Sequence, residues 1–189
     1  MAENKLEAFM KGLSAAVELA YRASSNGYLV EYVVLSASII DASLRMALIL
    51  QHQLDTSSTE IPKELLYQGE GDKAVSERSI YRRALEAGLI TEKLFERLQD
   101  LYSERNKVVH RYIVSDITTM DAFRIARDFE ETVPLIRDAV SIVEEKQIES
   151  GVGMTRPSTS EEPHPDLSSW GTDKHGAEWL ARAIKKEAT

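Results

Sequence analysis

The chain has 189 residues, a hydrophobic content of 43% and a formal net charge of −8. This length allows one well-packed domain with an appendage, and the hydrophobic content is ordinary for a soluble globular protein. The negative charge argues against indiscriminate nucleic-acid binding by the whole surface. Because the sequence contains no cysteine, a disulfide framework and a thiolate zinc site are both excluded.

Two features of the sequence bear on where the protein resides. The start, Met1 to Lys5, lacks a basic segment followed by an apolar core, so we expect no secretory signal peptide. The most apolar run, residues 32–50, contains Asp41 and Arg45, whose spacing suits an ion pair within one helix. We interpret this run as a buried central helix, which explains it better than a membrane span, and we expect a cytoplasmic protein.

Hydrophobic residues recur at helical spacing along most of the chain and are interrupted by Gly, Ser, Thr or Pro clusters. The first predicted helix has periodic apolar residues at 6–20 and a stop signal at 24–27. The other main helices are predicted at residues 28–54, 76–87, 94–112 and 118–149, and a short helix can begin near Pro62. No segment alternates with period two, so we expect no sheet. The pattern predicts an all-α, up-and-down bundle of about five helices within residues 1–149.

Local signals refine the ends of the last two predicted helices. Thr91 is a suitable N-cap for the helix that ends near Tyr112, and the sequence from Thr118 to Asp121 resembles a capping box. Pro134 falls inside the final helix and predicts a kink there.

The composition changes after residue 149. Residues 150–176 are rich in Gly, Ser, Thr, Pro and acids, which is typical of a flexible linker that cannot bury a core. Residues 177–187 then predict a short amphipathic helix with Trp179, Leu180 and Ile184 as its apolar side chains. Such a helix is marginal alone in water, so we expect it to dock onto its own bundle, a second copy, or a groove of a partner protein.

Arg105 is the most informative residue, because it lies on an apolar helical stripe. The stripe consists of Leu94, Leu98, Leu101, Arg105, Val108 and Tyr112. An unpaired buried charge costs several kcal/mol or more. The guanidinium therefore either pairs with a carboxylate, for which Asp41, Asp100 and Glu104 are candidates, or lines a cleft that binds an anion.

His110 follows Arg105 with the spacing R-x4-H, and Tyr112 extends the pattern to R-x4-H-x-Y. Five residues rotate an ideal helix by about 140°, whereas seven return it to within about 20°. Arg105 and Tyr112 therefore share a face that His110 does not share. Convergence of Arg105 and His110 needs a local distortion or a second helix related by a two-fold axis, so we expect a homodimer.

The charge around this motif differs from that of the whole chain. Residues 78–127 hold ten Lys or Arg and seven Asp or Glu, a local net charge of +3. This local excess is compatible with a restricted phosphate-binding site and also with ordinary solvated helix faces, which composition alone slightly favours.

The motif resembles the signature of the HEPN superfamily of small helical proteins, whose ribonuclease members have R-x4-6-H, frequently with a polar residue after the arginine. Asn106 occupies that position here. The resemblance extends over roughly residues 28–149 as an arrangement of helices. Tyr112 resembles the tyrosine of HEPN toxins whose nucleotidyltransferase antitoxin modifies the hydroxyl group. The chain departs from those toxins in its long segment after Ser150.

The resemblance implies a metal-independent endoribonuclease, without a cofactor, that acts as a toxin or phage-defence effector. His110 would exchange protons with the ribose 2′-hydroxyl or the leaving 5′-oxygen, and Arg105 would stabilise the phosphorane charge. Asn106 would orient the histidine or the phosphate, and Lys107 and Arg111 are candidates for RNA binding. The product would be a 2′,3′-cyclic phosphate, and the expected partners are RNA, a second copy and an antitoxin.

Structural explanations compete with this interpretation. Arg105 can belong to a purely structural ion pair, His110 can stabilise the negative end of a helix dipole, and Tyr112 can be a packed aromatic side chain. Asp41 and Arg45 are expected to form a structural pair. Two other classes of function therefore stay open: a HEPN-like module that binds nucleotide or RNA without cutting, and a helical scaffold that recruits a partner through the C-terminal segment.

Overall fold

The computed structural model describes residues 2–66 and 75–156, which fold into an all-α bundle without a strand. Its helices are α1 (Ala2–Asn26), α2 (Leu29–Thr56), α3 (Lys63–Leu66), α4 (Glu77–Glu86), α5 (Glu92–Arg111) and α6 (Thr119–Ser150). The predicted fold class is confirmed. The predicted helix at 177–187 and most of the predicted linker lie outside the described residues.

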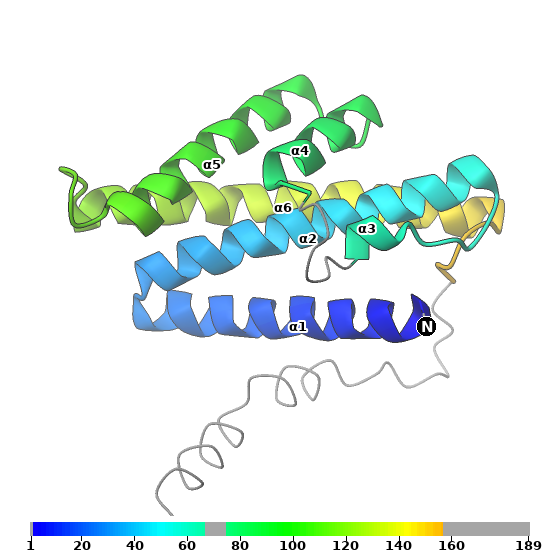
Figure 1. Cartoon of the computed structure of the whole chain (residues 1–189), viewed down its shortest axis with the longest axis horizontal. Helices are drawn as coiled ribbons and strands as arrows, with labels where there is room; N and C mark the ends of the chain where they lie inside the picture. The colour runs from blue at the N-terminus through cyan, green and yellow to red at the C-terminus, as the bar shows by residue number, and fades with distance from the viewer. Residues whose placement is uncertain (1, 67–74, 157–189) are drawn as a thin grey trace, which may run out of the picture.

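Helix α2 is the centre of the bundle. It packs against each of the other five helices, most extensively against α6 and α1. Figure 1 shows α1 along one side of α2, the α4–α5 pair on the opposite side, and α6 running beside α2. The turn between α1 and α2 and the connection between α5 and α6 lie at the same end of the molecule (Figure 1). This end also contains the R-x4-H-x-Y motif.

The core explains the apolar character of α2. Ile40, Leu44 and Ile49 of α2 are at most 1% exposed and share one hydrophobic cluster with Leu98 of α5 and Phe129 of α6. By length and composition alone α2 could also cross a membrane, yet 67% of its most apolar window is buried inside the bundle. The burial is typical of the central helix of a helical bundle.

The helix starts that the sequence predicts are present. The Thr91 hydroxyl accepts from the Leu94 N–H at 3.3 Å at the start of α5. At the start of α6, Thr118 and Asp121 form the reciprocal capping box, and the hydrogen bonds from Thr118 lower the pKa of the Asp121 carboxyl. Helix α6 continues through Pro134. These caps fix the direction in which α5 and α6 leave their connecting loops.

Two buried glutamines hold the chain that follows α6 against the bundle. The Gln147 amide donates to the Leu50 carbonyl at 2.8 Å and to Gln53 Oε1 at 3.1 Å. In return, Gln53 Oε1 accepts from the Met154 N–H and Gln147 Oε1 accepts from the Thr155 N–H. This Gln53–Gln147 clasp satisfies backbone donors that would otherwise be buried without partners.

Candidate functional site at the end of α5

Arg105 projects from α5 toward the start of α4. Its Nη2 donates to Glu77 Oε1, and its Nη1 donates to Asn106 Oδ1 at 3.0 Å. The guanidinium carbon lies 5.1 Å from the centroid of the Tyr102 ring, which is a cation–π distance. The Arg105 side chain is only 16% exposed. Its orientation is thus set by a carboxylate, an amide and an aromatic ring.

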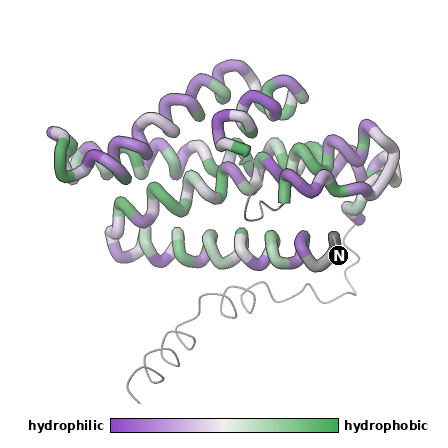
Figure 2. Tube along the Cα trace, viewed as in Figure 1, coloured by the Kyte–Doolittle hydropathy of each residue, from purple (hydrophilic) through white to green (hydrophobic). Residues whose placement is uncertain are grey.

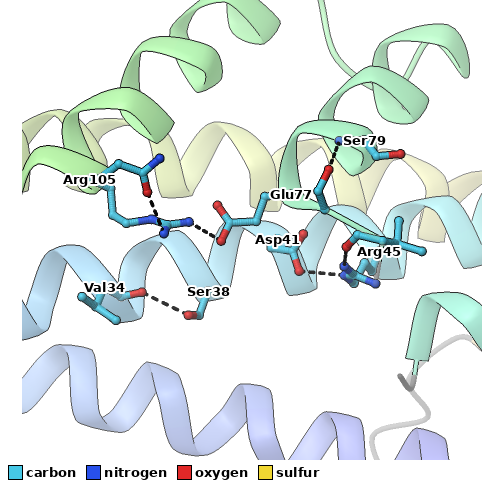
Figure 3. A network of polar contacts seen from close by, with 10 residues as sticks. Val34, Ser38, Asp41, Arg45, Glu77, Ser79 and Arg105 are labelled. Atoms are coloured by element: carbon cyan, nitrogen blue, oxygen red, sulfur yellow. Dashed lines mark hydrogen bonds and ion pairs between the residues drawn. The ribbon is translucent and has the colours of Figure 1, made fainter. Parts of the chain in front are cut away.

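A second ion pair lies next to the first, along α2. Arg45 Nε donates to Asp41 Oδ2 at 2.7 Å, and Arg45 Nη2 donates to the Val75 carbonyl at 2.9 Å. Figure 3 shows Arg105, Glu77, Asp41 and Arg45 in a row between α2 and the α4–α5 pair. The predicted ion pair between Asp41 and Arg45 is confirmed.

The four charged groups form a cluster that is balanced in charge but incompletely hydrogen-bonded. Burial raises the pKa of Asp41, while the neighbouring Arg45 and Arg105 oppose that shift. Asp41 Oδ1, Glu77 Oε2 and Arg105 Nε are buried and have no hydrogen-bond partner within residues 2–66 and 75–156. Burial, together with the Glu77 and Asp41 charges, also raises the pKa of Tyr81. Opposite charges therefore stabilise the cluster, although three of its polar atoms lack a hydrogen-bond partner among the described residues.

His110 and Tyr112 lie beyond this cluster. His110 and Arg111 are exposed in the last turn of α5, and Tyr112 is the C-cap residue with 40% exposure. In the described part of the chain no hydrogen bond joins His110 to Arg105. Lys107 is exposed and pairs with Glu104 at 2.5 Å. One chain thus brings Arg105 and Asn106 together but leaves the imidazole on a different face of α5, as the 140° rotation predicts.

The partner of Arg105 differs from the candidates that the sequence suggested. The carboxylate is Glu77, rather than Asp41, Asp100 or Glu104, because the start of α4 packs beside α5. Glu77 is 28 residues away in sequence and belongs to another helix, so helical spacing could not identify it. The only signal available was its place in the first turn of α4, directly after the Ser76 N-cap.

The apolar stripe of α5 is also shorter than predicted. Leu98, Leu101 and Val108 are buried, whereas Tyr112 is exposed because the helix ends at Arg111. Next to Tyr112, Ile113 and Val114 are 94% and 81% exposed. Figure 2 shows hydrophobic colour at this corner, where α5 turns toward α6. A contiguous set of exposed apolar residues is typical of a surface that another molecule covers.

A cavity of about 440 Å³ lies between the last turns of α5 and the start of α6. Its lining is mainly charged and includes Glu104, Lys107, Asp121 and Arg124, but neither Arg105 nor His110. Nowhere in the described ranges do three or more His, Cys, Asp or Glu side chains gather as a potential metal site. His110 and Tyr112 thus lie on the surface of a single chain, whereas Arg105 is mostly buried beside Glu77.

No protein-family model matches the chain, and no curated protein or solved structure matches it either. The functional interpretation rests on the residues at the end of α5 and their surroundings.

Proposed function

We propose that the protein is a HEPN-like, metal-independent endoribonuclease whose active unit is a homodimer. The main support is the combination found at one end of α5: an oriented guanidinium, an exposed imidazole and uncovered apolar side chains. Arginine and histidine supply the charge stabilisation and the proton transfer that cleavage of a ribose-phosphate linkage requires. The exposed Val109, Ile113 and Val114 provide an apolar surface for the second copy.

The proposed reaction is an attack within the RNA strand. The His110 imidazole removes the proton of the ribose 2′-hydroxyl, and the resulting oxygen forms a bond to the adjacent phosphorus. The bond from phosphorus to the 5′-oxygen breaks, and that oxygen takes a proton from an imidazolium. Arg105 stabilises the charge on the phosphorane, while Asn106 fixes the guanidinium by accepting from Nη1. The product is a 2′,3′-cyclic phosphate, and DNA resists because it lacks the nucleophile.

A dimer would bring together the guanidinium and the imidazole, which a single chain keeps apart. Within one α5, Arg105 and His110 point about 140° apart. A two-fold axis near the exposed end of α5 would let the imidazole of one protomer face the guanidinium of the other. The same contact would cover apolar side chains that are now in solvent.

Tyr112 suggests how such an enzyme is silenced. Its side chain is 40% exposed at the end of α5, two residues from His110. A nucleotidyltransferase antitoxin could therefore reach the phenol and add a bulky, charged group beside the imidazole. We therefore propose that the protein acts in a toxin–antitoxin or phage-defence system.

Cleavage of RNA in EDTA tests the proposal. The wild type should cut single-stranded RNA and leave 2′,3′-cyclic phosphate ends, while His110→Ala and Arg105→Ala should each lower the rate by about 100-fold or more. His52→Ala, a histidine on α2 outside the motif, is the matched control and should retain full activity. Cleavage that persists in His110→Ala, or a wild type that does not cut, would reject the nuclease.

One observation favours a second candidate, a module that binds RNA or nucleotide without cutting. Glu77 neutralises Arg105 within each chain, so the guanidinium could be structural. Retained RNA binding without cleavage would select this module. If the protein has no RNA interaction and captures a partner only when residues 170–189 are present, it is a scaffold.

A further inference from the structure

Three arginines and two aromatic rings alternate between α4 and α5, from the exposed Arg82 and Arg78 to the mostly buried Arg105. The guanidinium carbon of Arg82 lies 5.9 Å from the centroid of the Phe95 ring. Those of Arg78 and Arg105 lie 5.6 Å and 5.1 Å from the centroid of the Tyr102 ring. These five residues form what we call the arginine ladder, and Arg105 is its end nearest to His110.

Helical spacing produces the ladder. Arg78 and Arg82 are four apart on α4, and Phe95 and Tyr102 are seven apart on α5, so each pair lies on one side of its helix. Gln99 lies between the two rings and accepts from Arg78 Nε at 2.7 Å. The rings are half-buried, whereas Arg78 and Arg82 are exposed. The ring faces therefore orient the planar guanidinium groups of Arg78 and Arg82, and the N–H groups along their edges reach solvent.

The charges of Arg78 and Arg82 are also available to an outside anion. Arg22, Arg83, Arg97, Arg124 and Arg127 each pair with a carboxylate. No such pair forms at Arg78 or Arg82 with any side chain in the described ranges. Arg78 and Arg82 therefore place two exposed positive charges without a described carboxylate partner one helical turn apart on α4.

We propose that Arg78 and Arg82 of the arginine ladder bind successive phosphates of a single-stranded RNA and guide the strand toward Arg105 and His110. Cβ atoms four residues apart on a helix are about 5–6 Å apart, a spacing comparable with that of neighbouring phosphates along a strand. Asn106 lies one turn beyond Tyr102 and His110 one turn further, so a strand that follows α5 reaches the motif. Grooves that combine arginine with aromatic side chains are typical of single-strand binding. The inference rests on the proposed function, because it assigns a substrate path to that site.

Binding of a substrate that cannot be cleaved tests the ladder independently of catalysis. The probe is a short, fluorescent, single-stranded 2′-O-methyl oligouridine, and its affinity is measured by anisotropy over a range of salt concentrations. Arg78→Gln and Arg82→Gln should each weaken binding several-fold and reduce the slope of log affinity against log salt by about 0.7. Arg22→Gln removes an equal charge from α1, on the opposite side of α2, and should change neither quantity (Figure 1).

Further variants separate a phosphate contact from simple packing. Arg78→Lys keeps the charge but loses the planar fork, so it should bind more weakly than the wild type and retain most of the salt slope. Circular dichroism confirms that each variant is folded. Three results would overturn the proposed role of the ladder in RNA binding. The first is an unchanged affinity in both glutamine variants, and the second is a loss of affinity with an unchanged salt slope. The third is a wild type that binds polyglutamate instead of RNA.

The two proposals fail in distinguishable ways. RNA binding that depends on Arg78 and Arg82, in a protein that never cuts RNA, would reject the nuclease and support the ladder. RNA cleavage whose rate and KM are the same in the wild type, Arg78→Gln and Arg82→Gln would reject the ladder and leave the nuclease intact.

Discussion

Arg105 belongs both to a buried ion pair of the fold and to the proposed site. Its guanidinium is mostly buried, yet its Nε has no acceptor and Glu77 Oε2 has no donor among the described residues. Removing one partner of a buried ion pair leaves the other charge uncompensated, which costs more than the pair contributes relative to two apolar groups. Glu77 should therefore be energetically coupled to Arg105.

We predict that Glu77→Gln lowers the free energy of unfolding by roughly 2 kcal/mol, less than the 3–5 kcal/mol of a fully buried pair, because the glutamate side chain retains 26% exposure. In urea denaturation, Glu77→Gln combined with Arg105→Gln should cost less than the sum of the single variants. Glu104→Gln breaks the exposed pair with Lys107 and should change stability by no more than about 0.5 kcal/mol. Strictly additive effects of Glu77 and Arg105 would show that the two are not coupled.

At the scale of elements, the path of the chain after α6 depends on Gly153, whose role was not predicted from the sequence. Gly153 has φ of +89°, and a Cβ at this position would overlap the Gln147 amide. That amide is fully buried and holds the Gln53–Gln147 clasp, so it cannot move without losing its hydrogen bonds. The chain beyond α6 can follow its course only with glycine here.

Gly151 supplies the matched control for this position. It also has a positive φ, +67°, but a Cβ there would meet nothing within 4 Å. Gly151→Ala should therefore cost only the backbone strain of about 1–2 kcal/mol. Gly153→Ala should lower the thermal midpoint clearly further, because it adds the loss of the clasp to the same strain. Equal midpoints for the two variants would contradict the role of the Gln53–Gln147 clasp.

The elements that could be predicted are those whose signals are local. Thr91 and Thr118 cap α5 and α6 as expected, because N-cap chemistry depends on residues within one turn. Tyr112 was predicted to lie on the buried stripe, but it is exposed because helix α5 ends one residue earlier, at Arg111. The end of helix α1 is also as predicted: the helix ends at Asn26, and Gly27 of the predicted stop at residues 24–27 has a positive φ of +72°.

At the scale of the whole molecule, the bundle was predictable but the surroundings of Arg105 were not. Periodicity identifies which residues of a helix face inward, and the central position of α2 follows from its apolar residues on most sides. Which helices become neighbours depends on packing over long sequence distances. The pairing of Arg105 with Glu77 and the arginine ladder both arise from the contact between α4 and α5, which no local pattern encodes.

The exposed corner at the end of α5 has consequences for assembly. Val109, Tyr112, Ile113 and Val114 are exposed and lie within four residues of His110, so a partner that covers them would also approach the imidazole. In a monomer, Arg105 and His110 stay on different faces of the same rigid helix. The proposed catalysis therefore requires that each site combine residues from two protomers.

Mixing two inactive variants tests this shared site most directly. Heterodimers of His110→Ala with Arg105→Ala, isolated through different affinity tags, retain one site in which the wild-type histidine faces the wild-type arginine. They should cleave RNA in EDTA, although neither parent homodimer does. Heterodimers that stay inactive beside an active wild type would contradict a site shared between protomers, and an inactive wild type would contradict the nuclease itself.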